Sequence, residues 1–190
     1  MVDPILKEQR KKAAKPMMWI GMVSMAMVFA GLTSGYIVRR AEGNWLLFDL
    51  PQEMWFSTLA IILSSVTMIF TTRMAKKGDR NKMISGLLGT FILGVIFVFL
   101  QFSSFGVLTE GGIYFTGAQS NAAGSFLYVI VVAHLVHVAF GFASLIYMTA
   151  KGLLGKYDNG ETLGLEVGAS FWHFLDGVWL YLFLFMYFIR

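Results

Sequence analysis

Two carboxyl groups and an imidazole lie inside one long apolar run near the end of the chain, at Glu166, His173 and Asp176. A carboxylate near the middle of a membrane costs about 3 kcal/mol on insertion scales, so spanning a bilayer does not explain Asp176. Positions three and seven residues apart share one side of a helix, and Trp172 and Trp179 flank that side. We therefore expect a buried polar group that faces protein or a hydrated pocket.

Two further imidazoles, His134 and His137, lie three residues apart in another apolar run. Such a pair can ligate haem or copper, hydrogen-bond to a neighbouring helix, or contact a lipid headgroup. His173 is the only other histidine, and the chain contains no cysteine, so thiolate ligands and disulfides are excluded. We favour hydrogen bonding between helices, and we expect no metal, cofactor or catalytic residue on this chain.

The composition indicates which elements position these side chains. Hydrophobic residues make up 57% of the 190 residues and charged residues only 14%, against about 25% charged in soluble domains. Five apolar runs approach or exceed the roughly 20 residues that a membrane-spanning helix needs. The predicted spans are residues 17–38, 54–74, 83–107, 122–150 and 165–189. We expect an all-α polytopic membrane protein, with a five-helix bundle over residues 17–190 and a basic arm over residues 1–16.

The distribution of positive charge predicts the orientation of the bundle. With the N-terminus inside, the outer segments hold only 3 of the 15 Lys and Arg residues, namely Arg39, Arg40 and Arg190. The positive-inside rule therefore predicts an N-in, C-out topology. The basic arm is interpreted as an orientation signal that is flexible or lies on the membrane surface, with docking to a partner as the alternative. The excess of basic residues reflects topology, and we expect no nucleic-acid partner.

The sequence argues against a stand-alone function. It shows no internal repeat, and five spans cannot divide into the equal halves that many transporters have. It also contains no nucleophile elbow, no phosphate-binding loop and no zinc-protease motif. A compact membrane unit with a buried polar patch suits an accessory subunit better than an independent enzyme.

The segment from Glu166 to Leu180 resembles the signature tail of subunit III of haem–copper cytochrome oxidases. That tail runs acid, small residues, Trp-His-Phe, a hydrophobic residue and then Asp-x-Val-Trp. Further stretches resemble the family in the same order, namely residues 64–67, 78–80, 88–101 and 134–141. The likeness covers nearly all of the chain from about Met17 and is to the shorter, five-span bacterial form of the subunit.

The resemblance implies a non-catalytic subunit of a proton-pumping cytochrome c oxidase in a bacterial inner membrane. Such a subunit packs against subunit I, and the haems and copper reside in subunits I and II. It is expected to stabilise subunit I, support proton uptake and bind phospholipid. Subunit II, small subunits and a larger respiratory supercomplex are further expected partners. The alternatives are the matching subunit of a quinol oxidase and, from another class, an independent small membrane transporter.

The resemblance also assigns a polar core. By motif position, its members are His134, His137, Glu166, His173 and Asp176. We expect these side chains to form a buried network that links the last two spans and carries out no redox chemistry.

One departure from the family pattern lies in the first span. Many family members carry a membrane-embedded carboxylate in the matching helix, where this chain has Met25. No acidic residue occurs between Glu8 and Glu42, so a role that depends on that carboxylate is not expected to transfer.

Overall fold

The computed structural model describes residues 4–42, 45–117, 120–157 and 162–189. Five α-helices account for most of this part of the chain. They are α1 (Pro4–Arg40), α2 (Gln52–Lys76), α3 (Arg80–Glu110), α4 (Ala122–Leu153) and α5 (Leu163–Phe188). Each contains a stretch that is long and apolar enough to cross a membrane. An all-α fold follows because a helix satisfies its own backbone hydrogen bonds in hydrocarbon, where water is absent. The prediction of five helices long and apolar enough to span a membrane is therefore confirmed. Four of the predicted ranges lie within these helices, and the fifth ends one residue beyond Phe188.

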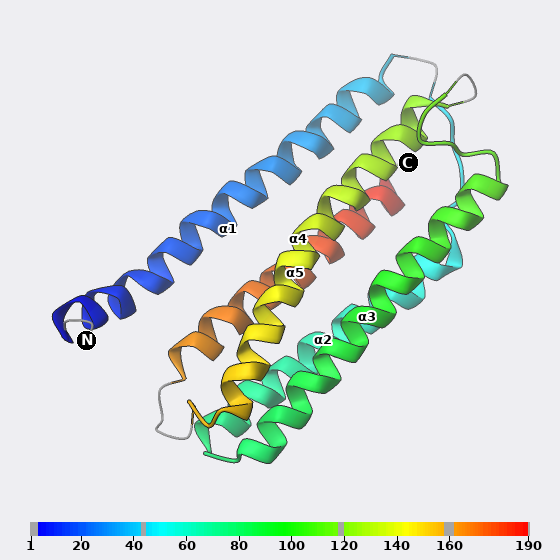
Figure 1. Cartoon of the computed structure of the whole chain (residues 1–190). Coiled ribbons are helices and arrows are strands. Elements are labelled where there is room, and N and C mark those ends of the chain that lie inside the picture. The colour runs from blue at the N-terminus through cyan, green and yellow to red at the C-terminus, as the bar shows by residue number, and fades with distance from the viewer. Residues whose placement is uncertain (1–3, 43–44, 118–119, 158–161, 190) are drawn as a thin grey trace.

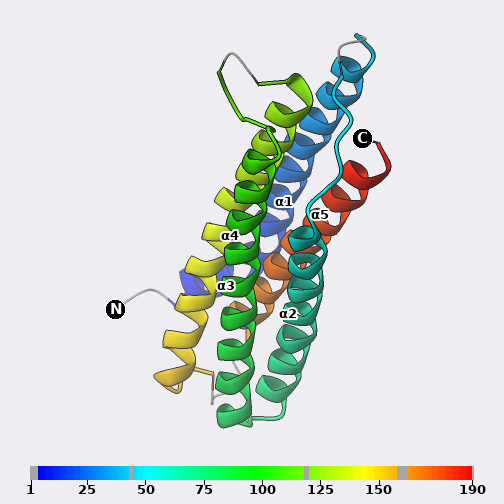
Figure 2. The ribbon, with the colours of Figure 1, turned by 90° about the vertical axis from the view of Figure 1, so that its right-hand side faces the viewer.

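Helices α2, α3, α4 and α5 form a ring, and α1 packs on its outside (Figure 1, Figure 2). Helix α2 contacts α3 and α5, and α4 contacts α3 and α5, which closes the ring. Helix α1 packs on the outside against α4 and α5. Successive helices run in opposite directions. The start of α1, the α2–α3 turn and the α4–α5 connection therefore lie at one end of the bundle, called here the amino-terminal end (Figure 1).

The basic arm is helical from Pro4 onward and continues directly into the first span. An ion pair one helical turn apart, Glu8 with Lys12 at 2.9 Å, lies within this extension. Pro16 lies inside the helix. The predicted start of the first span at residue 17 therefore does not coincide with the start of the helix. Arg190 and residues 1–3 lie outside the described part of the chain.

Helices α2 and α3 are joined by a tight turn at the amino-terminal end. Gly78 has a φ of 73°, a conformation that glycine adopts without steric cost. Asp79 then caps α3, because its side chain accepts a hydrogen bond from the backbone N–H of Lys82. This short connection makes α2 and α3 an antiparallel pair.

The interior of the ring is filled by aromatic side chains. Trp172 and Trp179 of α5 and Phe97 of α3 are fully buried there. The rings of Phe97 and Trp179 meet edge to face, with centroids 5.0 Å apart. At Gly141 of α4, an added Cβ would lie 3.1 Å from the Trp172 ring. The absence of a side chain at Gly141 thus lets α4 and α5 approach closely.

Candidate functional site

A polar cluster joins α5 to α2 near the middle of the bundle. The hydroxyl of Ser65 donates to Oδ2 of Asp176 across 2.5 Å. The Oγ atom of Ser65 also lies 2.8 Å from Nδ1 of His173. Because the hydroxyl has one proton and donates it to the carboxylate, it accepts from His173, which places the imidazole proton on Nδ1. A single serine of α2 thus holds both polar side chains of α5.

Two buried tryptophans of α5 also hydrogen-bond to hydroxyls of α2. The indole N–H of Trp172 donates to Ser64 Oγ, and that of Trp179 donates to Thr58 Oγ1, each across 3.0 Å. These bonds satisfy the two indole donors inside an apolar core. Trp172, near the amino-terminal end of α5, thus meets Ser64, and Trp179, further along α5, meets Thr58, which precedes Ser64 in the antiparallel α2.

Helix α3 also hydrogen-bonds to hydroxyls of α2. The amide nitrogen of Gln101 donates to Ser57 Oγ across 2.6 Å, and both side chains are fully buried. The hydroxyls of α2 also donate to carbonyls of their own helix, as Ser64 does to Ile61. Such a hydroxyl donates to its own backbone and accepts from a neighbouring helix. Helix α2 is thus bonded on one side to α5 and on the other to α3.

The histidines of α4 lie apart from this cluster. His134 is fully buried, and neither of its ring nitrogens has a hydrogen-bond partner in the described part of the chain. Its ring packs against those of Phe29, Phe97 and Trp179, at centroid distances of 6.0, 6.0 and 5.2 Å. His137 Nδ1 lies 2.6 Å from the carbonyl oxygen of Ala133 in its own helix.

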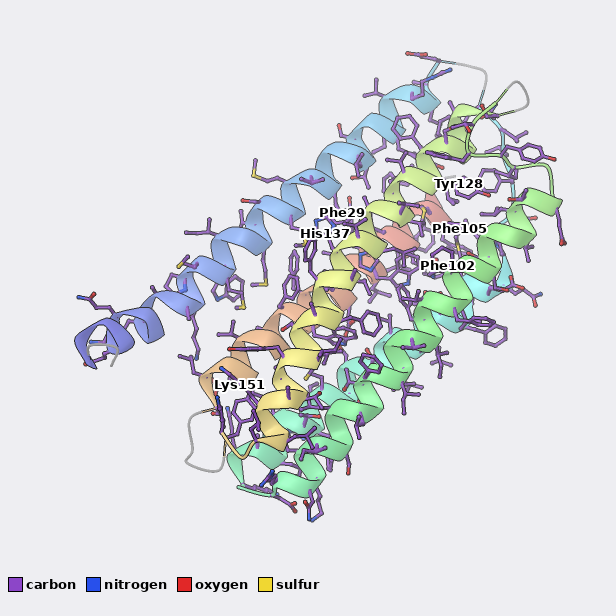
Figure 3. The ribbon with its side chains drawn as sticks, in the orientation of Figure 1. Phe29, Phe102, Phe105, Tyr128, His137 and Lys151 are labelled. Carbon is purple, nitrogen blue, oxygen red and sulfur yellow. The ribbon has the colours of Figure 1, made fainter. Side chains whose placement is uncertain are left out.

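The expected network between the last two spans is therefore not the one observed. The described hydrogen bonds of Asp176 and His173 run to α2, and the contact of His134 with α5 is a ring contact with Trp179. In Figure 3, His137 of α4 lies beside Phe29 of α1, and their ring centroids are 5.4 Å apart. The reason is that α5 touches both α2 and α4, and helical spacing does not say which neighbour a polar side faces.

Glu166 lies away from the buried cluster, at the amino-terminal end of α5. Its carboxylate pairs with Lys15 of α1 at 3.0 Å and with Lys76 of α2 at 3.3 Å. The side chain of Glu166 is 28% exposed, and both lysines are more exposed. This cluster connects three helices by ion pairs at the surface. Neither lysine is distinguished by a motif, so sequence spacing did not identify them as partners.

The chemistry available at these residues is hydrogen bonding. Among the described residues, no group of three or more His, Cys, Asp or Glu side chains is arranged to hold a metal ion. The polar side chains of α5 instead pair with hydroxyls of α2, and the hydroxyl partners of this site were not among the predicted residues. Their signal in the sequence is the number of hydroxyl side chains in the second span, where Thr58, Ser64 and Ser65 lie, together with the family resemblance of residues 64–67.

Comparison with known proteins finds one consistent set of relatives. Residues 48–190 match the family model described as cytochrome c oxidase subunit III. A probable cytochrome c oxidase subunit 3 of Mycobacterium bovis is 31% identical over 176 residues, which cover 90% of this chain and 85% of that protein. The subunit 3 of Corynebacterium diphtheriae is 30% identical over 86% of this chain and 82% of its own length. The subunit 3 of Loxodonta africana is 31% identical over 69% of this chain but only 48% of its own length.

Proposed function

Because this chain belongs to the cytochrome c oxidase subunit III family, we propose that it is the accessory, non-catalytic subunit III of a proton-pumping terminal oxidase in aerobic respiration. The observation that carries the proposal is the family match over residues 48–190, which includes all of α2 to α5. The described polar side chains of α5 fit it, because they join helices of this chain to one another. The names of the relatives favour cytochrome c over quinol as the electron donor.

In this proposal the chain packs beside subunit I, and the haems and copper reside in subunits I and II. Its contribution is structural. A rigid bundle, bonded internally through α2, stabilises subunit I during turnover and supports proton uptake at the inner side. The exposed apolar side chains on several helices fit contacts with partner subunits and with phospholipid, and Trp19 and Phe140, for example, are more than half exposed.

The proposal places the protein in a bacterial inner membrane, with its amino-terminal end on the inner side. Lys76, Lys77 and Arg80 surround the α2–α3 turn at that end. The bond from Arg80 Nε to the Gly152 carbonyl, 3.1 Å long, ties this turn to the end of α4. A cluster of basic groups at one end of the bundle supports this orientation.

Purification from the native membrane in mild detergent tests the proposed function. A tag on the full-length chain should recover the haem–copper subunit I and subunit II, identified by mass spectrometry and by their haem absorbance. Recovery of the chain without any haem protein would contradict the proposal. Transport activity of the isolated chain in vesicles would instead favour an independent transporter.

A further inference from the structure

Helices α1 and α2 pack on either side of α5 but do not contact each other within the described residues. Between them a strip of α5 remains uncovered. It is defined here as the α5 strip, whose exposed members include Gly177, Leu180 and Leu184. Leu180 is 38% exposed and Leu184 is 41% exposed, although both lie in the membrane-spanning part of the helix.

The α5 strip has the spacing of a helix-packing seam. Starting at Glu166, its residues follow at alternating steps of four and three, and they are Ser170, His173, Gly177, Leu180, Leu184 and Tyr187. This spacing of 3.5 residues on average keeps one side of a helix against a second, slightly inclined helix. The ion pairs of Glu166 with Lys15 and Lys76 lie at the amino-terminal end of the strip.

A groove adjoins the strip on the side of α1. Its volume is about 360 Å³, and its lining residues are Ala26, Phe29, Ala30, Phe174, Gly177, Val178 and Tyr181. An added Cβ at Gly177 would meet no atom within 4 Å. Ala26 and Ala30 on the facing wall are also small and exposed. Small residues at such a place allow the backbone of another helix to approach closely.

His173 lies on the other side of Gly177, one helical turn away, and is only partly buried. Its Nδ1 is held by Ser65, and Nε2 forms no hydrogen bond within the described residues. Behind it, Asp176 is 6% exposed, and its Oδ1 also has no partner in that part of the chain. A polar side chain left unpaired in hydrocarbon is costly, and acyl tails have no group that can pair with it.

We propose that the α5 strip is the docking surface for a membrane-spanning helix of the oxidase's catalytic subunit, which places a hydrogen-bonding side chain opposite Nε2 of His173. The inference rests on the proposed function and specifies where on this chain the partner binds. Gly177 and the two alanines of α1 allow the partner helix to approach closely. His173 determines the depth in the membrane at which the partner's hydrogen-bonding side chain lies. A protein helix is favoured over a lipid because it alone provides a fixed hydrogen-bonding group at mid-depth.

A matched pair of glycine substitutions tests the surface in the complete complex. Gly177→Leu fills the strip, and Gly106→Leu adds the same side chain on α3, where an added Cβ also meets nothing within 4 Å. With tagged full-length chains, Gly177→Leu should lower the recovered haem protein by about tenfold, and Gly106→Leu should leave it unchanged. Equal thermal stability of the two isolated variants shows that the loss arises at the interface.

The outcomes separate the two proposals. If the unsubstituted chain recovers no haem protein, the proposed function fails. If the unsubstituted chain and Gly177→Leu recover it equally well, the proposed function stands and the docking surface is wrong.

A photo-crosslinking residue identifies the occupant directly. Placed at Leu180, it should form adducts with subunit I in native membranes. The control position is Phe99, which is 72% exposed on α3 and should give at least tenfold less of that adduct. Adducts from position 180 only with lipid, or only with a second copy of this chain, would overturn the proposal.

Discussion

At the scale of single residues, Ser65 is the centre of the polar cluster. Its one hydroxyl oxygen bonds to both Asp176 and His173, so the two α5 side chains are coupled through it. Hydrogen bonds between membrane helices are worth roughly 0.6 kcal/mol on average and up to about 1.7. The cluster therefore aligns α2 with α5 more than it adds to total stability.

We predict that Asp176→Leu lowers the stability of the chain by about 1 kcal/mol and weakens assembly of the complex, because Ser65 loses its acceptor. The haem spectra of any complex that forms should stay unchanged, since Asp176 bonds within this chain. Thermal unfolding in detergent measures the first effect and absorbance spectroscopy the second.

Ser65→Ala provides the matched change from the α2 side. Because both single substitutions remove the same bond, the double variant should lose less stability than the two single losses together. Strict additivity would show that the two side chains are not coupled, and altered haem spectra in an intact complex would indicate a more direct role for Asp176.

At the scale of elements, α2 and α3 make the most extensive contact in the bundle. Small and hydroxyl side chains allow this approach. Thr67 and Thr90 bond to each other across the pair, with their oxygens 2.8 Å apart. Gly86 of α3 lies against Thr71 of α2, where an added Cβ would collide with the threonine hydroxyl.

Gly86→Ala should destabilise the chain by about 1–3 kcal/mol, the usual cost of inserting a methyl group into a packed interior. The control is Gly31→Ala in α1, where an added Cβ meets nothing within 4 Å. There the better helix propensity of alanine should leave stability unchanged or raise it by up to about 1 kcal/mol. Thermal unfolding of both variants in the same detergent measures the two changes in stability. An equal loss of stability in both variants would refute the packing argument.

The cap of α3 predicts a dependence on pH. Hydrogen bonds from the side chain and the backbone N–H of Lys82 lower the pKa of Asp79 below its ordinary value. Because the pKa is lower in the folded chain, the stabilisation is present above the ordinary aspartate pKa. It is lost as the pH falls through the lowered one.

Asp79→Ala should therefore destabilise the chain at neutral pH, and the difference from the unsubstituted chain should shrink as the pH falls below the ordinary aspartate pKa. Asp79→Asn, which keeps a capping oxygen without the charge, should lose less and show a weaker dependence on pH. Unfolding midpoints at pH 7 and at acid pH provide the measurement. A difference for Asp79→Ala that stays constant over this range would exclude the charged cap.

At the scale of the whole molecule, the four helices of the ring are more buried than the outer helix α1. Several polar side chains of the ring bond to hydroxyls of α2, whereas α1 has the smallest buried share of any span, at 17%. This exposure matches a subunit that completes its packing with lipid and with a partner chain.

The orientation of the whole bundle can be measured because the chain lacks cysteine. Single replacements Lys77→Cys and Thr116→Cys introduce thiols at exposed positions at opposite ends of the bundle. If the N-terminus is inside, an impermeant thiol reagent added to intact cells should label residue 116 and should label residue 77 only after lysis. The reverse pattern would overturn the N-in topology.

The amino-acid sequence alone determined the number, type and approximate limits of the membrane helices and indicated the family. Long apolar runs have few alternatives in a bilayer, because the helix is the main single-segment form that satisfies its own backbone. The sequence also identified Asp176 and His173 as polar side chains that are unusual within a membrane-spanning segment. Only the tertiary structure decided that they face Ser65 of α2, that His134 lies among aromatic rings, and that Glu166 pairs with two lysines. Helical periodicity defines which side chains share a side, whereas the neighbour of that side depends on how distant helices pack.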